Sequence, residues 1–328
     1  MKNLTGWRAV GVAFVAGALA ALAMPPLQWL PLAVLGMVVF VWQWDTASGP
    51  RSALWRGWAW GLGHFAVGSY WILDAFFVPP ADFAFAGPPI VIGLAAILGF
   101  FPGLAGMAAK WAALRWPRLG GRYCRLLLLA IGWTAAEWLR GHVFTGYPWN
   151  PLGHVWAFAT PLLQSVSLFG VYGLGLLSFL VLAAPAAGWR ASIAALVLVG
   201  IAGFGGQLAM APVNAAEGPL VRVVQPNTPQ AEKWQPENRA RQLAKLVEMS
   251  RRDGFDRLSA VVWPETAPPF IVEPGSPALK VMGAAAPPGG YLLTGAARST
   301  GVRGDGVWNS LLVIDPAGAI VADRKSVV

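Results

Sequence analysis

Charged residues are scarce in this sequence. They make up 12% of its 328 residues, whereas soluble domains average about 25%, and hydrophobic residues reach 56%. This composition excludes a disordered chain and argues against an ordinary cytosolic enzyme. Cysteine is also nearly absent, since Cys124 is the single copy. A disulfide framework is therefore excluded.

Acidic residues are rare in the first two thirds of the chain. Residues 1–212 hold 11 of the 24 Lys and Arg but 4 of the 15 Asp and Glu, whereas residues 213–328 hold 13 and 11. The first segment is apolar and sparsely charged, and the second has the composition of soluble protein. We predict a transmembrane helical domain over 1–212 and a separate extramembrane domain over 213–328.

Seven apolar stretches of the first segment are long enough, or nearly so, to cross a membrane as helices. About 30 Å of hydrocarbon requires about 20 helical residues. The stretches lie at residues 8–24, 27–44, 53–74, 88–109, 124–140, 160–187 and 191–211. The first also has the flanks of a cleaved signal peptide, but because further spans follow at once we interpret it as a span. The sequence thus predicts a polytopic α-helical membrane bundle of about seven spans.

Lys and Arg in the short loops predict the orientation of the spans. Arg140 alone lies on one side of the membrane. The other side collects ten basic residues, Lys2, Arg8, Arg51, Arg56, Lys110, Arg115, Arg118, Arg122, Arg125 and Arg190. We predict that this side, with the N-terminus, is cytoplasmic, and that residues 213–328 are periplasmic at a bacterial inner membrane. The net charge of +9 is then mainly a topology signal, and we expect no nucleic-acid partner.

Two ionisable residues lie together inside a predicted span. Burying a charge in lipid costs several kcal/mol, so such residues need a partner or a function. Glu137 and Arg140 are three residues apart on one helical face, which favours a mutual ion pair. Direct contact with a substrate is the alternative.

The second segment alternates short strands and helices. Strands are predicted at 220–225, 260–263 and 291–295, helices at 236–252 and 277–285, and a hairpin from 307–314 and 319–322. This order indicates an α/β layered domain, and it fits the beginning of such a domain better than a whole one.

A carboxylate directly follows one of the buried strands, where the chain reads Val261-Val262-Trp263-Pro264-Glu265. In α/β domains the carboxyl ends of strands border the ligand crevice, and a carboxylate held there can act as a general base. A solvated loop carboxylate would occupy the same position, so the motif alone leaves both interpretations open.

The sequence resembles the bacterial apolipoprotein N-acyltransferases, whose extramembrane domain is of the nitrilase type. The extramembrane motifs are Trp263-Pro264-Glu265, Val223-Val224-Gln225-Pro226-Asn227-Thr228-Pro229-Gln230, Lys233-Trp234 and Trp308-Asn309-Ser310-Leu311. The membrane motifs are Glu137-Trp138-Leu139-Arg140-Gly141, Phe144-Thr145-Gly146-Tyr147-Pro148-Trp149, Pro161-Leu162-Leu163-Gln164 and Gly170-Val171-Tyr172-Gly173. The resemblance covers essentially the whole chain, and soluble nitrilases share only the extramembrane set.

The resemblance implies an acyltransferase of lipoprotein biosynthesis with a nitrilase-like αββα domain. Such an enzyme transfers one acyl chain from a phospholipid, usually phosphatidylethanolamine, to the amino group of the diacylglyceryl-cysteine that begins an apolipoprotein. The resemblance implies a Glu-Lys-Cys triad that works through a thioester, without a metal or cofactor. Glu265 matches the base that deprotonates the thiol. Lys325 lies near the place of the lysine that stabilises the oxyanion, about one residue out of step.

Three aromatic residues are candidate substrate-binding residues. Tyr147 and Trp149 are expected near the outer membrane interface, where aromatic side chains anchor among headgroups. An ordinary aromatic belt is the alternative for them. Trp234 lies before the first helix of the second segment, and the resemblance implies a role in substrate gating.

The chain also departs from the family pattern. No cysteine follows Cys124, which is predicted to lie across the membrane from Glu265. We therefore expect this chain to be the N-terminal part of such an enzyme and inactive by itself. Two other hypotheses remain, a non-catalytic lipid- or lipoprotein-binding membrane protein and a membrane transporter with an accessory domain. The sequence has no internal repeat of the kind that transporters use.

Overall fold

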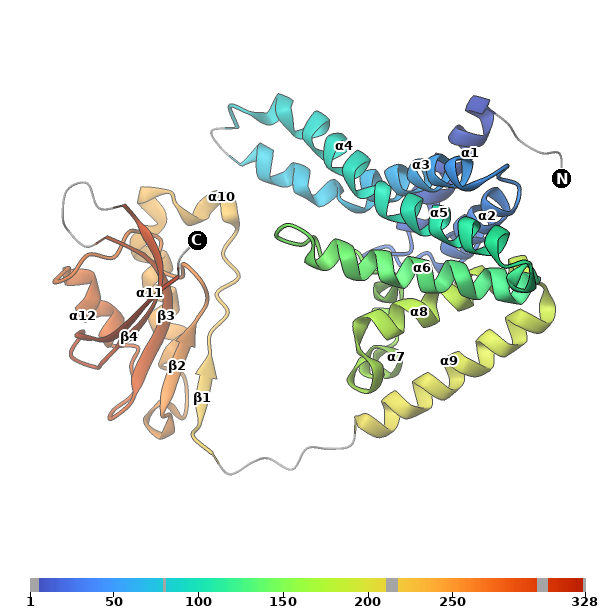
Figure 1. Cartoon of the computed structure of the whole chain (residues 1–328). Helices are drawn as coiled ribbons and strands as arrows, with labels where there is room; N and C mark the ends of the chain where they lie inside the picture. Colours follow the sequence, from blue (N-terminus) through green and yellow to red (C-terminus); the bar gives the residue numbers. More distant parts are fainter. Residues whose placement is uncertain (1–5, 79–80, 211–217, 300–305, 327–328) are drawn as a thin grey trace. The chain divides into compact units, whose positions relative to one another are not determined.

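The computed structural model describes residues 6–78, 81–210, 218–299 and 306–326 (Figure 1). Contacts along the chain divide it into two compact units, Met1–Pro212 and Val213–Val328. Each unit has a hydrophobic core of its own.

The first unit is helical. Its helices are α1 (Gly6–Ala21), α2 (Leu30–Asp45), α3 (Pro50–Gly68), α4 (Gly87–Leu98), α5 (Phe100–Arg115), α6 (Arg122–His142), α7 (Thr160–Gln164), α8 (Val166–Ala187) and α9 (Trp189–Ala209). Its 3₁₀ turns are η1 (Tyr70–Phe77), η2 (Ala84–Ala86), η3 (Pro117–Leu119) and η4 (Leu152–Trp156).

Several of these helices have the length and composition of membrane spans. Among the described residues, three segments are long and apolar enough to cross a membrane, namely Ala84–Arg115, Val166–Ala187 and Trp189–Ala209. Helices α1 and α2 are apolar but shorter. The first unit is therefore consistent with a membrane protein.

Three predicted apolar stretches are not continuous α-helices. The stretch 88–109 is divided at Gly99 between α4 and α5. The stretch 53–74 leaves the α-helix at Gly68 and continues as the 3₁₀ turn η1. The stretch 160–187 is divided between α7 and α8, and Gly170 within α8 has a φ of 73°. Glycine adopts this left-handed conformation without the steric cost that a Cβ would add. Apolarity alone predicted all three stretches, and it does not distinguish a continuous α-helix from helices joined or ended by an apolar turn.

Glycines allow α1 and α3 to approach closely. A Cβ placed on Gly17 would lie 1.8 Å from the carbonyl oxygen of Trp60, and one placed on Gly63 would lie 2.0 Å from the carbonyl oxygen of Phe14. Membrane helices pack through such small residues because lipid provides little hydrophobic drive for helix association. Trp60 is fully buried in the core of the unit.

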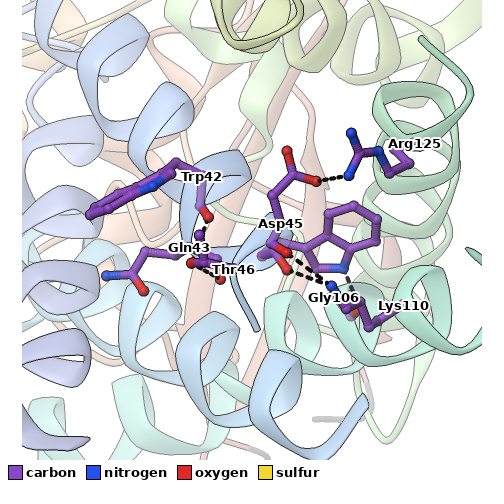
Figure 2. A network of polar contacts seen from close by, with 8 residues as sticks. Trp42, Gln43, Asp45, Thr46, Gly106, Lys110 and Arg125 are labelled. Carbon is purple, nitrogen blue, oxygen red and sulfur yellow. Dashed lines mark hydrogen bonds and ion pairs between the residues drawn. The ribbon is translucent and has the colours of Figure 1, made fainter. Parts of the chain in front are cut away.

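A polar network joins α2, α5 and α6 (Figure 2). Arg125 Nη1 lies 2.9 Å from Asp45 Oδ1, and Lys110 Nζ donates to the carbonyl oxygens of Trp44 at 3.2 Å and Asp45 at 3.1 Å. The indole N–H of Trp44 donates to the carbonyl oxygen of Gly106 at 2.7 Å. Lys110 thus binds carbonyls at the end of α2, which have no partner within the helix.

The second unit contains a five-stranded mixed sheet. Its strands are β1 (Val221–Val223), β2 (Ala260–Trp263), β3 (Tyr291–Arg298), β4 (Trp308–Ile314) and β5 (Ile320–Ser326), adjacent in that order. β1, β2 and β3 are parallel, and β3, β4 and β5 are antiparallel. Its helices are α10 (Gln230–Lys233), α11 (Arg239–Ser250) and α12 (Pro277–Gly283), with 3₁₀ turns η5 (Pro236–Asn238) and η6 (Phe255–Arg257). Side chains of α11 and α12 share one core with β2, β3 and β4.

The predicted elements of this unit are largely confirmed. β2 has the predicted bounds, whereas β3 and β5 continue beyond the predicted ends to Arg298 and Ser326. The predicted helix 236–252 begins as the 3₁₀ turn η5 and ends at Ser250. The short helix α10 was not predicted.

Candidate functional site

Glu265 lies in the loop that follows β2, beside the start of β4. Its Oε1 accepts a hydrogen bond of 2.5 Å from Nδ2 of Asn309, and its side chain is exposed. The backbone of Glu265 lies against Gly295 of β3, where a Cβ would come within 2.5 Å of the Glu265 Cα. The N–H of Ala267 donates to the carbonyl oxygen of Gly295 at 3.0 Å. Three neighbouring strands therefore position this carboxylate.

Gly295 has no room for a larger side chain, because it packs against the backbone of Glu265. We expect Gly295→Ala to lower the free energy of unfolding of the second unit by about 1–3 kcal/mol, because backbone atoms must shift to admit the methyl group. Denaturant unfolding of the whole chain in detergent measures the change. Gly306→Ala is the matched control, since a Cβ there meets none of the described residues within 4 Å. Equal stability of the two variants would contradict the close packing.

The residue after Glu265 is held by a lysine. Thr266 has a φ of 47°, an uncommon left-handed conformation for a β-branched residue. Lys233 Nζ donates to Thr266 Oγ1 at 2.9 Å and lies 5.9 Å from the centre of the Trp234 ring. The structure thus brings Trp234, at the end of α10, close to the loop that carries Glu265.

Lys325 lies on β5, where the register pairs it with Ser310. Asn309, which binds Glu265, is paired with Ser326. The Ser310–Lys325 pair is therefore the neighbour of the Asn309–Ser326 pair along β4 and β5. For Lys325, the side chain lies outside the described residues.

A groove in the second unit lies apart from Glu265. Its volume is about 400 Å³, and it is lined by residues of the start of α12 and of the β4–β5 turn, including Ser276 and Gly318. Asn309 is near the first residue of β4 and this turn follows the last, so about 20 Å of strand separates them. The groove is not part of the Glu265 site.

Tyr147 and Trp149 lie in the loop that follows α6 in the first unit. Arg140 Nη1 donates to the carbonyl oxygen of Tyr147 at 2.8 Å and to that of Trp149. The Tyr147 hydroxyl lies 2.9 Å from Ser69 Oγ, and the Trp149 ring centre lies 5.6 Å from that of Trp71. This loop, residues 143–151, is thus fixed from within the helical unit while Trp149 stays exposed.

Glu137 holds the other end of the same loop. Its Oε1 accepts a hydrogen bond of 2.7 Å from the N–H of Leu152 and lies 4.0 Å from Arg140 Nη2. The predicted pair is therefore confirmed, with Glu137 5% and Arg140 3% exposed. The cavity beside them measures about 10 Å³, room for one water at most. Both charges hold the loop, which favours the ion pair over direct contact with a substrate.

Sequence reasoning did not single out every residue of these two sites. Asn309 was part of the motif Trp308-Asn309-Ser310-Leu311 but was not assigned a role. Its polar side chain in the largely apolar strand β4 was a signal that it has a polar partner. The contact between Lys233 and Thr266 joins residues 33 positions apart, and no local pattern indicates it. Within the part of the chain that the structure describes, no group of three or more His, Cys, Asp or Glu could hold a metal ion.

Comparison with known proteins identifies the family. Residues 16–184, about half of the chain, match the family described as "Apolipoprotein N-acyltransferase N-terminal domain". The chain belongs to the apolipoprotein N-acyltransferase family. Curated proteins of that name are similar over nearly the whole chain. The protein from Brucella suis is 38% identical over 99% of this chain, that from Rhodopseudomonas palustris 34% over 97%, and that from Caulobacter vibrioides 34% over 90%.

This chain spans only part of those apolipoprotein N-acyltransferases. It covers 64% of the Brucella suis protein, 63% of the Rhodopseudomonas palustris protein and 57% of the Caulobacter vibrioides protein. The family match includes Arg140 and the loop with Tyr147 and Trp149. Glu265 lies beyond the family match but within the near-complete alignments to the relatives.

Proposed function

We propose that this chain acts in apolipoprotein N-acylation, the transfer of an acyl chain from a phospholipid to the amino group of a diacylglyceryl-cysteine. Phosphatidylethanolamine is the proposed donor, and an apolipoprotein is the proposed acceptor. The observation that carries the proposal is the Glu265 carboxylate, bound by Asn309 at the end of β2, in a chain whose relatives share this name across its length. Family membership favours this function over a membrane transporter.

The chemistry proposed for Glu265 is that of a general base. The carboxylate takes the proton from a cysteine thiol, and the thiolate attacks the ester carbonyl of the phospholipid. The ester C–O bond breaks, the lysophospholipid leaves with the proton, and a thioester remains. The acceptor amine then attacks the thioester, and the thiol is regenerated. Asn309 orients the carboxylate, and Lys325 is proposed as the cation that stabilises the oxyanion.

The proposed architecture places these groups relative to the membrane. Residues 1–212 form a bundle of about seven spans in the bacterial inner membrane, with the N-terminus in the cytoplasm. Residues 213–328 form the N-terminal part of a nitrilase-like catalytic domain in the periplasm. The ten basic residues on one side of the predicted spans, against Arg140 on the other, support this orientation.

Tyr147, Trp149 and Trp234 are the proposed substrate-binding residues. Trp149 and Trp234 have exposed rings, and Trp234 lies beside the cation of Lys233. We expect Trp234→Ala to weaken phospholipid binding by about 5- to 30-fold, since burial of such a ring contributes about 1–2 kcal/mol. Titration with a fluorescent phosphatidylethanolamine measures this change. Trp111→Ala, an exposed tryptophan of α5, is the control, and equal affinities would contradict the role of Trp234.

The proposed first half-reaction is tested with a chimera. It joins residues 1–328 to the part of the Brucella suis relative that follows the aligned region. From the family resemblance we expect this part to carry the cysteine of the triad. Incubated with phosphatidylethanolamine, the chimera should form an acyl-enzyme that hydroxylamine cleaves. A folded chimera that binds the lipid without forming a thioester would contradict the proposal and favour the non-catalytic lipid-binding alternative.

The 328 residues alone should form no such acyl-enzyme. Residues 213–328 contain no cysteine, and Cys124 lies in the first turn of α6 in the other unit. Mass spectrometry of the chain after incubation with the lipid should show no hydroxylamine-sensitive acyl group, as for a Cys124→Ala variant. An acyl group on the original chain that the variant lacks would contradict this expectation.

A further inference from the structure

Arginines and aromatic rings gather at the end of the first unit where α6 and α9 begin. Arg122 and Tyr123 start α6, and Trp189 and Arg190 start α9. We call these four residues the junction patch. Arg122 Nη1 lies 3.4 Å from the place that a Cβ on Gly188, between α8 and α9, would occupy. The two pairs are therefore neighbours, as the adjoining ends of α6 and α9 in Figure 1 show.

Each arginine of the junction patch lies over the ring beside it in sequence. The Arg122 Cζ is 4.9 Å from the centre of the Tyr123 ring, and Nη2 donates to the Tyr123 hydroxyl at 3.2 Å. The Arg190 Cζ is 5.3 Å from the centre of the Trp189 ring. All four side chains are exposed. Tyrosine and tryptophan at the ends of membrane helices lie at headgroup depth, so the two guanidinium groups are placed at the level of lipid phosphates.

The positive charge of the junction patch has no acidic partner among the described residues. In the first unit the ion pairs join Asp45 to Arg125 and Glu137 to Arg140. The other two acidic residues, Asp74 and Asp82, lie between α3 and α4. Because α3 and the α4–α5 segment each run the length of the unit, these residues are at its opposite end.

We propose that the junction patch binds the headgroup of an anionic phospholipid from the adjoining leaflet. Two planar guanidinium groups suit the oxygens of a phosphate, which each can bind with two hydrogen bonds. The net negative charge of phosphatidylglycerol or cardiolipin complements the patch better than zwitterionic phosphatidylethanolamine does. This site is distinct from the proposed substrate-binding residues Tyr147 and Trp149, because the 21 residues of α6 separate them by about 30 Å.

Native mass spectrometry of the 328-residue chain, released from detergent with cardiolipin or phosphatidylethanolamine, tests the proposal. Cardiolipin should be retained in preference to phosphatidylethanolamine. The double variant R122Q/R190Q should bind cardiolipin about 25-fold more weakly, since each arginine that contacts the anionic headgroup contributes about fivefold. The matched control R51Q/R118Q removes the same charge from two exposed arginines at the same end of the unit. Its affinity for cardiolipin should stay within about twofold of that of the original chain.

Three outcomes would overturn the proposal. Equal retention of the two lipids would show that charge does not select the ligand. Equal losses in the two double variants would show a diffuse basic surface rather than a site at the junction patch. Displacement of cardiolipin by an equal concentration of inorganic phosphate would show a site for the free ion. Both pairs of arginines are exposed, and matching thermal unfolding of the variants in detergent verifies their fold.

Discussion

Glu265→Gln should slow acyl-enzyme formation in the chimera by about 10²- to 10⁴-fold, the usual contribution of a general base. The amide keeps the size of the carboxylate but cannot take the thiol proton at neutral pH. The decrease should appear in the rate of thioester formation after rapid mixing with phosphatidylethanolamine. Binding of the lipid should change little, because the proposed base acts on the thiol.

A matched substitution separates the site from a general effect of charge. Glu273→Gln makes the same chemical change at another exposed glutamate of the second unit and should leave the rate unchanged. Asn309→Ala should give an intermediate loss of about 10- to 100-fold, since a hydrogen bond to a charged group is worth about 1.5–3 kcal/mol. Thioester formation by the Glu265→Gln variant at the original rate would remove Glu265 from the role of base.

Arg140→Ala should be the most destabilising substitution considered in the first unit, at about 3–5 kcal/mol. The change leaves Glu137 as a buried charge without its partner, and such a loss costs more than the pair itself contributes. It also removes the donor to the carbonyl oxygens of Tyr147 and Trp149. Unfolding of the chain in detergent micelles gives the change in free energy, and the exposed Arg118→Ala should shift it by less than about 0.5 kcal/mol.

A double variant distinguishes the buried charge from the lost packing. Arg140→Met combined with Glu137→Gln removes both charges, and it should be more stable than Arg140→Ala alone. The loop should still loosen in the double variant, because its carbonyl oxygens lose their donor. Greater exposure of Trp149 to a fluorescence quencher would show this. Wild-type stability of Arg140→Ala would contradict the structural role of the ion pair.

The sequence predicted the elements of the second unit well and the helix ends of the first less well. β2 was predictable because four apolar residues are bounded by turn residues, and Glu265 was placed at its end by that boundary. The break at Gly68 was not predictable, since the residues after it are as apolar as a span. Backbone hydrogen bonding, rather than composition, decides where the α-helix ends there.

In the candidate sites, contacts within one helix were predictable from the sequence, whereas contacts between strands were not. The Glu137–Arg140 pair followed from a spacing of three residues on one helix. The hydrogen bond between Glu265 and Asn309 joins positions 44 residues apart, and only the pairing of β2, β3 and β4 brings them together. The position of Lys325 also depends on strand register, because a shift of one residue exchanges the faces of a strand.

The complete transfer reaction tests the central claim most directly. The chimera, phosphatidylethanolamine with a labelled acyl chain and a synthetic diacylglyceryl-cysteine peptide are incubated together, and the peptide is analysed by mass spectrometry. We predict one labelled acyl chain on the peptide α-amino group, and at least about 100-fold slower labelling with the Glu265→Gln chimera. A folded chimera that leaves the amine unmodified, or equal acylation by the Glu265→Gln variant, would contradict the account.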